Sequence, residues 1–343
     1  METLDIGIVM AVRNHPDRPY PLTEVYEDYI GDGVHAERLG FDHVWIGEHR
    51  MTPCQWTPSP VAVMTAIAAR TERIRIGSSV MCLPFHNPLR LAEDFAVMDQ
   101  ISAGRIDFGF GVGSQYEEYR TFGVDVARRF GMTYEAAALI EKCFSARETF
   151  SWEGRHYRFP EITFTTPPAQ ARMPFYASAI GPQSLALAAR RSYHLISVRQ
   201  PAYDESLRSA GRDPALHRAI PLQMVHVAAT TEQAWEEALE GLHYFANFYT
   251  LRRRVDGSVP DPAAVELTRK RIRAGSLGML GVPAVGTPDE VTATLRGVLR
   301  AFPGTSGFAL GFRHAGMRTP EVRRSMELFA REVLPNLRSA RVG

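Results

Sequence analysis

Three adjacent side chains that could move protons or bind anions, Glu48, His49 and Arg50, follow a short apolar segment. A histidine changes its charge near neutral pH, so His49 could act as a general base or as a hydrogen-bond donor. Arg50 and Glu48 beside it could contact a substrate or an anion. A histidine that only fixes its loop is the alternative, and position alone leaves both interpretations open.

Small residues mark two further places where a flat ligand could approach the backbone. Ser79 and Val80 lie in an apolar run, and small side chains there leave room beside a strand, although such a pair is usually only a packed spot. Gly111, Val112 and Gly113 form a glycine-rich turn, which permits close approach to a phosphate or a ring. The spacing of this turn is GxGxG and not the GxGxxG of dinucleotide sites.

The fourth place is the segment from Ile180 to Ser184, which connects a predicted strand to a predicted helix. Pro182 suits the first helical position. The free backbone N–H groups around Gly181 and the hydroxyl of Ser184 could together form an anion site at the helix N-terminus. An ordinary helix cap is the alternative.

These four places must be positioned by the elements around them. Apolar strand-like runs alternate with amphipathic helical stretches, and each candidate lies in, ends or follows one of the predicted strands. Eight strand–helix units favour a (β/α)₈ TIM barrel over an open sheet, and in such a barrel the functional groups gather at the carboxyl ends of the strands. The predicted strands are Leu4–Met10, Phe41–Gly47, Ile74–Leu83, Ile106–Gly111, Pro174–Ala177, Leu195–Ser197, Pro221–Ala229 and Gly307–Gly311. The predicted helices are Leu22–Leu39, Ser59–Arg70, Leu89–Ile101, Thr133–Phe150, Pro182–Arg191 and Pro320–Leu334.

The rest of the chain predicts one domain over residues 1–343 with a helical insertion at about 231–284. We expect a mobile stretch, Gly257–Gly286, near the barrel mouth, and irregular structure over Ser151–Ala171. We favour packing as the role of the aromatic residues Tyr244–Tyr249 and Trp56, because aromatic residues at helical spacing are usually core, and lining of a hydrophobic substrate pocket is the alternative. The arginines at 252–254 and 269–273 are interpreted as solvated helix faces.

Composition narrows the class of protein. Lys and Arg number 39 and Asp and Glu 38, so charge gives no reason to expect a nucleic acid or a membrane as partner. Three cysteines without CxxC spacing, and no signal peptide or long apolar run, favour a cytoplasmic protein. The sequence contains no HExxH motif and no carboxylate cluster at ligand spacing, so it does not predict a metal site. It contains no GxSxG motif, which argues against a serine hydrolase.

Several motifs, in this order and spacing, resemble those of the bacterial luciferase-like flavin-dependent monooxygenases. Ala36–Arg50 resembles the second-strand motif of that family with its Glu-His pair, and Leu83–Asp125 carries the strongest likeness, through the glycine turn to the FG-x-D element. Val285–Val291 and Ser325–Leu337 resemble the late motifs. The likeness covers nearly the whole chain and is weakest over Ala202–Gly281.

This resemblance implies a TIM barrel that binds reduced FMN at its mouth and oxygenates a small organic substrate with O₂ through a flavin hydroperoxide. A separate NAD(P)H:flavin reductase would supply the reduced FMN. His49 matches the catalytic histidine, Ser79–Val80 the position of a non-prolyl cis peptide beneath the flavin, and Gly181 and Ser184 the positions that hold the phosphate. A homodimer, formed through the helices Ser59–Arg70 and Leu89–Ile101, is also implied.

Two departures from the family pattern affect these expectations. Many relatives carry an arginine between the glycines of the fourth-strand turn, where this chain has Val112. Some relatives follow the Glu-His pair with another histidine, where this chain has Arg50. We therefore assign Arg50, with Glu48 and Glu118, to contact with the substrate or with an anion, and Arg50 could replace the missing phosphate contact.

Two other functions fit the same barrel. A relative that transfers hydride with a deazaflavin does not require the fourth-strand arginine, so Val112 favours that alternative, whereas His49 and Leu83–Asp125 favour the monooxygenase. A non-catalytic flavin-binding subunit is the other alternative, against which the presence of His49 argues. The substrate and the reaction subtype do not follow from the sequence.

Overall fold

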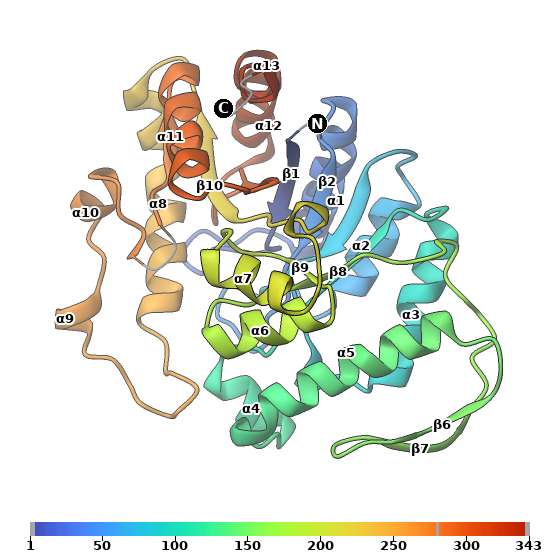
Figure 1. Cartoon of the computed structure of the whole chain (residues 1–343). Coiled ribbons are helices and arrows are strands. Elements are labelled where there is room, and N and C mark those ends of the chain that lie inside the picture. The colour runs from blue at the N-terminus through green and yellow to red at the C-terminus, as the bar shows by residue number, and fades with distance from the viewer. Residues whose placement is uncertain (1–3, 279–280, 340–343) are drawn as a thin grey trace.

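The computed structural model describes residues 4–278 and 281–339, and its centre is a barrel of eight parallel strands (Figure 1). Each strand pairs in parallel with its neighbour, from β10 through β12, β1, β2, β3, β5 and β8 to β9. Leu195 of β9 closes the ring by bridging to Ala219, just before β10. The barrel strands are β1 Asp5–Met10, β2 His43–Ile46, β3 Arg75–Ser78, β5 Ile106–Gly111, β8 Phe175–Ala177, β9 His194–Leu195, β10 Leu222–Val227 and β12 Gly307–Gly311. The predicted TIM barrel and its eight strands are therefore confirmed.

Helices surround the barrel, and most of them bury an apolar face, whereas α9 (Pro262–Val265) has no buried residue. They are α1 Leu22–Arg38, α2 Pro60–Ala68, α3 Pro88–Ile101, α4 Tyr116–Phe122, α5 Arg129–Ser145, α6 Pro182–Arg190, α7 Pro201–Ser209, α8 Thr231–Thr250, α9 Pro262–Val265, α10 Arg269–Arg273, α11 Pro288–Ala301, α12 Thr319–Leu328 and α13 Leu334–Ser339. The side chain of Asn87 caps α3 by accepting from the backbone N–H groups of Leu89 and Arg90, and Pro88 follows at the first helical position. α2 begins in the same way at Ser59–Pro60, although the Ser59 side chain makes no capping bond.

The strands are buried almost throughout, because each packs against helices on one face and against the barrel interior on the other. β5 illustrates the effect: all six residues from Ile106 to Gly111 are buried. This continuous burial explains why most of the strands could be predicted from apolar runs.

Four expectations about the elements need correction. The third predicted strand, Ile74–Leu83, is divided into β3 and a short β4 (Met81–Cys82), and the peptide bond between Ser79 and Val80, which lie between them, is cis. The segment Ser151–Ala171 is not irregular throughout, since β6 (Phe150–Glu153) and β7 (Arg158–Ile162) form an antiparallel hairpin that extends away from the barrel (Figure 1). Helices α4, α7 and α11 were not predicted, and the helix predicted to start at Thr133 begins at Arg129.

The insertion is helical, as predicted, and consists of α8, α9 and α10. The stretch predicted to be mobile contains α9, α10 and β11 (Ala284–Gly286), which pairs in parallel with β10 outside the eight-stranded ring. Met279 and Leu280, which belong to that stretch, lie outside the described residues. No helix in the described ranges is apolar over a length that could cross a membrane.

Candidate active site

A cavity of 710 Å³ lies at the carboxyl ends of the barrel strands. Its walls come from residues that end or follow β1, β2, β3, β5, β8 and β12, and from the end of α8. This is the end of a TIM barrel where catalytic groups gather, because the loops there can vary while the strands hold them in place.

Most of the predicted site residues meet at this cavity. The wall includes eight of them, Glu48, His49, Ser79, Val80, Gly111, Val112, Gly113 and Ile180. Four others lie outside the wall, Arg50, Glu118, Gly181 and Ser184. Positions that lie 30 to 131 residues after His49 in the chain thus reach one space because they follow neighbouring strands.

His49 is buried and is held from both sides of its ring. Its Nε2 lies 2.9 Å from the hydroxyl of Tyr249, within hydrogen-bond distance, and its Nδ1 lies 3.6 Å from Oε1 of Glu118. The ring also stands edge-on to Trp56, with 4.4 Å between the ring centroids. Glu118 is fully buried, so an imidazolium at His49 would have a carboxylate close by. His49 can therefore hold or pass a proton at Nε2 while Glu118 stabilises its charged form.

Glu48 and Arg50 form a second polar group beside His49. Oε2 of Glu48 accepts from the backbone N–H of Cys82 at 2.6 Å, and Oε1 contacts His86 at 2.9 Å and the Arg50 guanidinium. Burial alone would raise the pKa of Glu48, but these contacts with His86, Arg50 and Cys82 hold it below its ordinary value. The Arg50 guanidinium thus faces Glu48 and His86, and the backbone N–H of Arg50 donates to Glu118.

The glycine-rich turn after β5 serves two purposes. A Cβ at Gly109 would lie 1.8 Å from the backbone oxygen of Ser78, so this glycine is required by the close approach of β3 and not by a ligand. Gly111 and Gly113 line the cavity together with Val112. The cis peptide between Ser79 and Val80, at the position that the family resemblance implies, lies in the same wall.

The start of α6 is only partly turned to the cavity. Ile180 is 71% exposed and lines the wall. The hydroxyl of Ser184 donates to the carbonyl of Gly181 at 2.8 Å, which is a contact within the first helical turn. Gly181 is exposed at the N-cap position, so its neighbouring N–H groups remain accessible at this end of the helix.

Six arginines of the described residues line the cavity, and none of them was predicted to lie there: Arg13, Arg129, Arg252, Arg253, Arg254 and Arg313. Arg252, Arg253 and Arg254 do not form a helix face, since α8 ends at Thr250, and all three line the cavity together with Arg129. Arg252 lies 3.4 Å from Glu117 and also over the ring of Phe248. Three consecutive arginines directly after a helix were the available signal, but a spacing pattern does not show which way a loop turns.

The aromatic residues of the insertion also reach the site. Phe245 and Tyr249 of α8 and Trp56 of the loop after β2 line the cavity and pack on one another. The interpretation of these residues as packing alone is therefore wrong. Burial raises the pKa of Tyr249, so its hydroxyl stays protonated.

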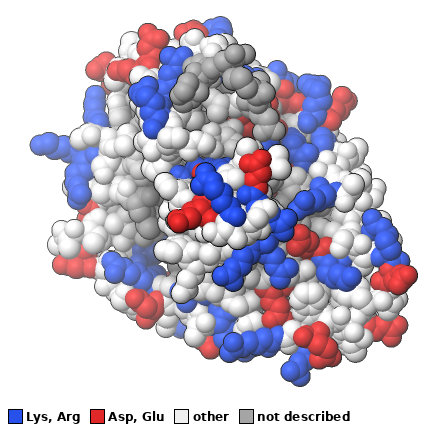
Figure 2. Space-filling model, in the orientation of Figure 1, with Lys and Arg blue, Asp and Glu red and all other residues white. Residues whose placement is uncertain are grey.

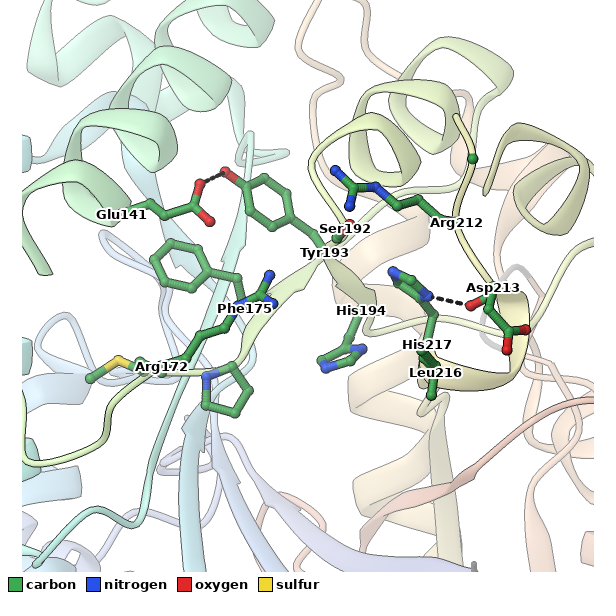
Figure 3. A pocket seen from close by; sticks show the side chains of 13 residues that line it. Glu141, Arg172, Phe175, Ser192, Tyr193, His194, Arg212, Asp213, Leu216 and His217 are labelled. Carbon is green, nitrogen blue, oxygen red and sulfur yellow. Dashed lines mark hydrogen bonds between the residues drawn. The ribbon is translucent and has the colours of Figure 1, made fainter. Parts of the chain in front are cut away.

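A second cavity, of 550 Å³, lies at the opposite end of the barrel (Figure 3). Phe175 and His194, the first residues of β8 and β9, contribute to it. Burial, with the nearby charge of His217, lowers the pKa of His194 to about 4, and Tyr193 donates to Glu141 at 3.2 Å. Side chains at the amino ends of barrel strands usually serve stability, so the 710 Å³ cavity is the candidate active site.

Comparisons with known proteins agree on a family but divide on the cofactor. The chain is 25% identical over 315 residues to limonene 1,2-monooxygenase from Rhodococcus erythropolis, with 88% of this chain and 79% of that protein covered. It is 27% identical to the F420-dependent glucose-6-phosphate dehydrogenase of Microbacterium testaceum, with 89% and 92% covered. Monooxygenase RslO1 from Streptomyces bottropensis has the same fold, with a TM-score of 0.84, 24% identity, and 97% and 99% of the chains covered.

A family model also matches most of the chain. Residues 4–304 match the family described as Luciferase-like monooxygenase, and this span takes in every candidate site residue at the 710 Å³ cavity. The relatives above include both monooxygenases and an F420-dependent dehydrogenase, so the family level is where sequence, fold and site agree. The chain belongs to the luciferase-like monooxygenase family and is a luciferase-like oxidoreductase.

Proposed function

We propose that this protein is an FMN-dependent monooxygenase that oxygenates a small organic substrate with O₂. The observation that carries the proposal is His49, a buried proton-handling residue between Tyr249 and Glu118 in the wall of a large cavity. The similarity to limonene 1,2-monooxygenase supports it. A separate NAD(P)H:flavin reductase would supply reduced FMN, and the protein would act as a homodimer.

The residues of the cavity fit a flavin. Its volume of 710 Å³ lies in the range of about 300 to 1,000 Å³ that is common for cofactor sites. Among the described residues, the buried polar atoms of its wall that have no hydrogen-bond partner include Ser79 Oγ, Trp56 Nε1 and His49 Nδ1. A buried polar group without a partner costs about 1–3 kcal/mol, and a flat ring system with carbonyl and N–H groups could offset that cost.

The arginines around the mouth would supply the positive charge that Val112 lacks. Arg129, Arg252, Arg253 and Arg254 line the same cavity as Val112. A guanidinium recognises phosphate through two parallel N–H donors, so these side chains would hold the phosphate of FMN. The backbone N–H groups near Gly113 and Gly181 would complete its surroundings.

The protein's own residues would handle protons and exclude water. Bound reduced FMN would supply the activation of O₂. His49 would give or take a proton at Nε2, with Tyr249 fixing its ring and Glu118 stabilising its cationic form. The apolar wall, including Trp56 and Phe245, would keep bulk water from the reacting atoms.

The experiment that tests the proposal is an anaerobic titration of the protein with oxidised FMN, reduced FMN and coenzyme F420. We expect reduced FMN to bind most tightly, and the bound reduced flavin to consume O₂ when oxygen is admitted. Binding of F420 alone, without any response to O₂, would contradict the proposal.

A deazaflavin-dependent hydride transfer is the second candidate. The similarity to the F420-dependent glucose-6-phosphate dehydrogenase favours it, and three consecutive arginines at the mouth would suit an anionic tail longer than one phosphate. The same titration separates the two, because only one of the two cofactors should bind tightly.

A further inference from the structure

Arg13, which follows β1, differs from the other buried arginines of the described chain. The four buried arginines are Arg13, Arg105, Arg199 and Arg313. Arg105 is satisfied by backbone carbonyls and the Thr71 hydroxyl, Arg199 by Asp204 and two carbonyls, and Arg313 by Asp32 at 2.5 Å. In contrast, Arg13 has a single hydrogen bond, from Nε to the carbonyl of Ala11 at 3.2 Å.

The remainder of the Arg13 guanidinium lies among aromatic rings. Its central carbon is 4.4 Å from the ring centroid of Phe245 and 4.8 Å from that of Trp56. Its Nη1 is buried and has no hydrogen-bond partner. Among residues 4–278 and 281–339, Arg13 forms no ion pair with a carboxylate.

A guanidinium in this position cannot lose its charge, because its pKa is too high for deprotonation in a protein. Burying an unpaired ion is costly, and cation–π contacts offset only part of that cost. A cation that is 4% exposed, unpaired and in the wall of a cavity therefore indicates an anion that binds from the cavity.

We propose that Arg13 binds the carboxylate of an apolar organic acid, which is the substrate class of this site. Since Nε is occupied by Ala11, the two terminal nitrogens would face the two carboxylate oxygens in parallel. The same cavity is lined by the apolar side chains of Val9, Met224 and Phe245, the last of which packs against the guanidinium, and these would receive the body of the acid. The inference rests on the proposed function only in taking this cavity as the active site.

The position of Arg13 also determines where a bound acid would lie relative to His49. Trp56 is in contact with both the Arg13 guanidinium and the ring of His49, whose centroid is 4.4 Å from that of Trp56. A carboxylate at Arg13 would thus place the rest of the molecule beside His49. The arginines of the mouth, Arg129 and Arg252–Arg254, would remain for the cofactor.

The test compares acids with their neutral amides in the protein without cofactor, at low chloride. The probes are phenylacetate against phenylacetamide and octanoate against octanamide, measured by calorimetric titration. Because removing one partner of a buried charge pair costs about 2–5 kcal/mol, we expect each acid to bind at least about 30-fold tighter than its amide. Arg13→Met should abolish this preference and Arg13→Lys should restore part of it, while Arg190→Met, on the exposed side of α6, should leave it unchanged.

Thermal unfolding without ligand gives a second readout. If Arg13 had a structural role, Arg13→Met would have a lower Tm than the parent protein. Arg13→Met removes an unpaired charge, so its Tm should equal or exceed that of the parent protein. Arg313→Met removes the partner that lies 2.5 Å from buried Asp32 and leaves only Arg323 at 3.5 Å, so its Tm should fall.

Three results would overturn the inference. They are equal affinity of acids and amides for the parent protein, a Tm loss in Arg13→Met as large as in Arg313→Met, and weakened FMN binding in Arg13→Met with the acid preference intact. A protein that binds no FMN but keeps the Arg13-dependent preference would refute the proposed function alone.

Discussion

His49 takes its chemical character from the side chains that hold it. Tyr249, whose own pKa is raised by burial, remains a hydroxyl donor or acceptor at neutral pH. Glu118 provides a buried carboxylate on the other side of the ring. A histidine placed between these groups can gain or lose a proton at Nε2 while its ring stays in place, which is what general acid–base catalysis requires.

Replacement of His49 should therefore affect turnover more than cofactor binding. For His49→Gln we expect kcat to fall by about 10²–10⁴-fold, the usual contribution of a positioned acid or base, with FMN affinity within about threefold of the parent. Tyr249→Phe keeps the ring and should cost less than about tenfold. Steady-state kinetics and flavin titration on the same samples measure both quantities. Unchanged kcat in His49→Gln would remove this residue from the mechanism.

The arginines at the mouth should determine how well the protein distinguishes FMN from riboflavin, which lacks the phosphate. Charge-assisted hydrogen bonds contribute about 1.5–3 kcal/mol each, so Arg129→Gln and Arg252→Gln should each weaken FMN binding by about tenfold or more. Riboflavin affinity should be nearly the same in the parent and in both variants. Equal losses for FMN and riboflavin would show that these arginines shape the cavity without contacting the phosphate.

These residue-scale features differ in how far the sequence reveals them. Glu48, His49, Gly111 and Val112 could be placed because they terminate apolar strands, and the carboxyl ends of barrel strands meet at one face. Arg13 and Arg252 were not placed, because each lies in a loop whose direction depends on tertiary contacts. The contact of the Arg50 guanidinium with His86 could not be predicted either, since His86 comes from a different loop.

At the scale of elements, β3 and β5 are brought so close that one position between them admits no side chain. Gly109→Ala would place a Cβ 1.8 Å from the Ser78 carbonyl oxygen, so backbone must move. We expect a loss of about 3 kcal/mol or a failure to fold. Gly297→Ala in α11, with open space around it, should instead stabilise the helix by up to about 1 kcal/mol. Urea unfolding of both variants measures the contrast, and equal effects would contradict it.

Strands β1, β2 and β5 are also linked by a buried charge cluster. Nδ1 of His43 lies 2.5 Å from Asp5 and Nε2 lies 3.0 Å from Asp107. Burial lowers the pKa of His43, but the hydrogen bonds to Asp107 and Asp5 outweigh it and raise the pKa to about 9. The folded protein therefore binds a proton here that an unfolded histidine, with a pKa of about 6.5, releases first.

Stability should consequently fall on the alkaline side of neutrality. The contribution of His43 is fully present below about pH 6.5 and is lost as the pH rises to about 9, a change of the order of 3 kcal/mol. Burial lowers the pKa of His194 to about 4, so its contribution is lost in the opposite direction, as the pH falls from 6.5. Chemical denaturation across pH 4–9 should show a maximum near neutrality. In His43→Gln the alkaline decline should flatten while the acid decline persists, and an unchanged alkaline limb would contradict the assignment.

Helices and strands could be predicted where one face of a helix or a whole strand is apolar. They could not be predicted where their formation depends on contacts with a distant part of the chain. The hairpin β6–β7 is half exposed, and its attachment depends on Glu135 of α5, which accepts from the backbone N–H groups of His156 and Tyr157. β11 is only three residues long and exists because β10 pairs with it. Neither contact produces a hydrophobic periodicity in the local sequence.

At the scale of the whole molecule, the barrel separates two ends with different tasks. The charged cluster around His43 and the 550 Å³ cavity lie toward the amino ends of the strands, and the 710 Å³ cavity lies toward the carboxyl ends. The face seen in Figure 2 mixes basic and acidic side chains, as expected for a chain with a net charge of +1. Association between copies should therefore depend on apolar contacts more than on charge.

The outer face of α3 is where we expect a second copy to bind. Val97 and Ile101, four residues apart and so on one side of the helix, are 47% and 49% exposed. Burying such side chains in a homodimer would remove apolar surface from water, whereas glutamate there would have to be desolvated. The double variant Val97→Glu with Ile101→Glu should convert dimers to single chains in analytical ultracentrifugation, with Arg331→Glu, an exposed position near the C-terminus, as control. If the parent protein already sediments as a single chain at micromolar concentration, α3 does not mediate a stable dimer, and the site must function within one barrel.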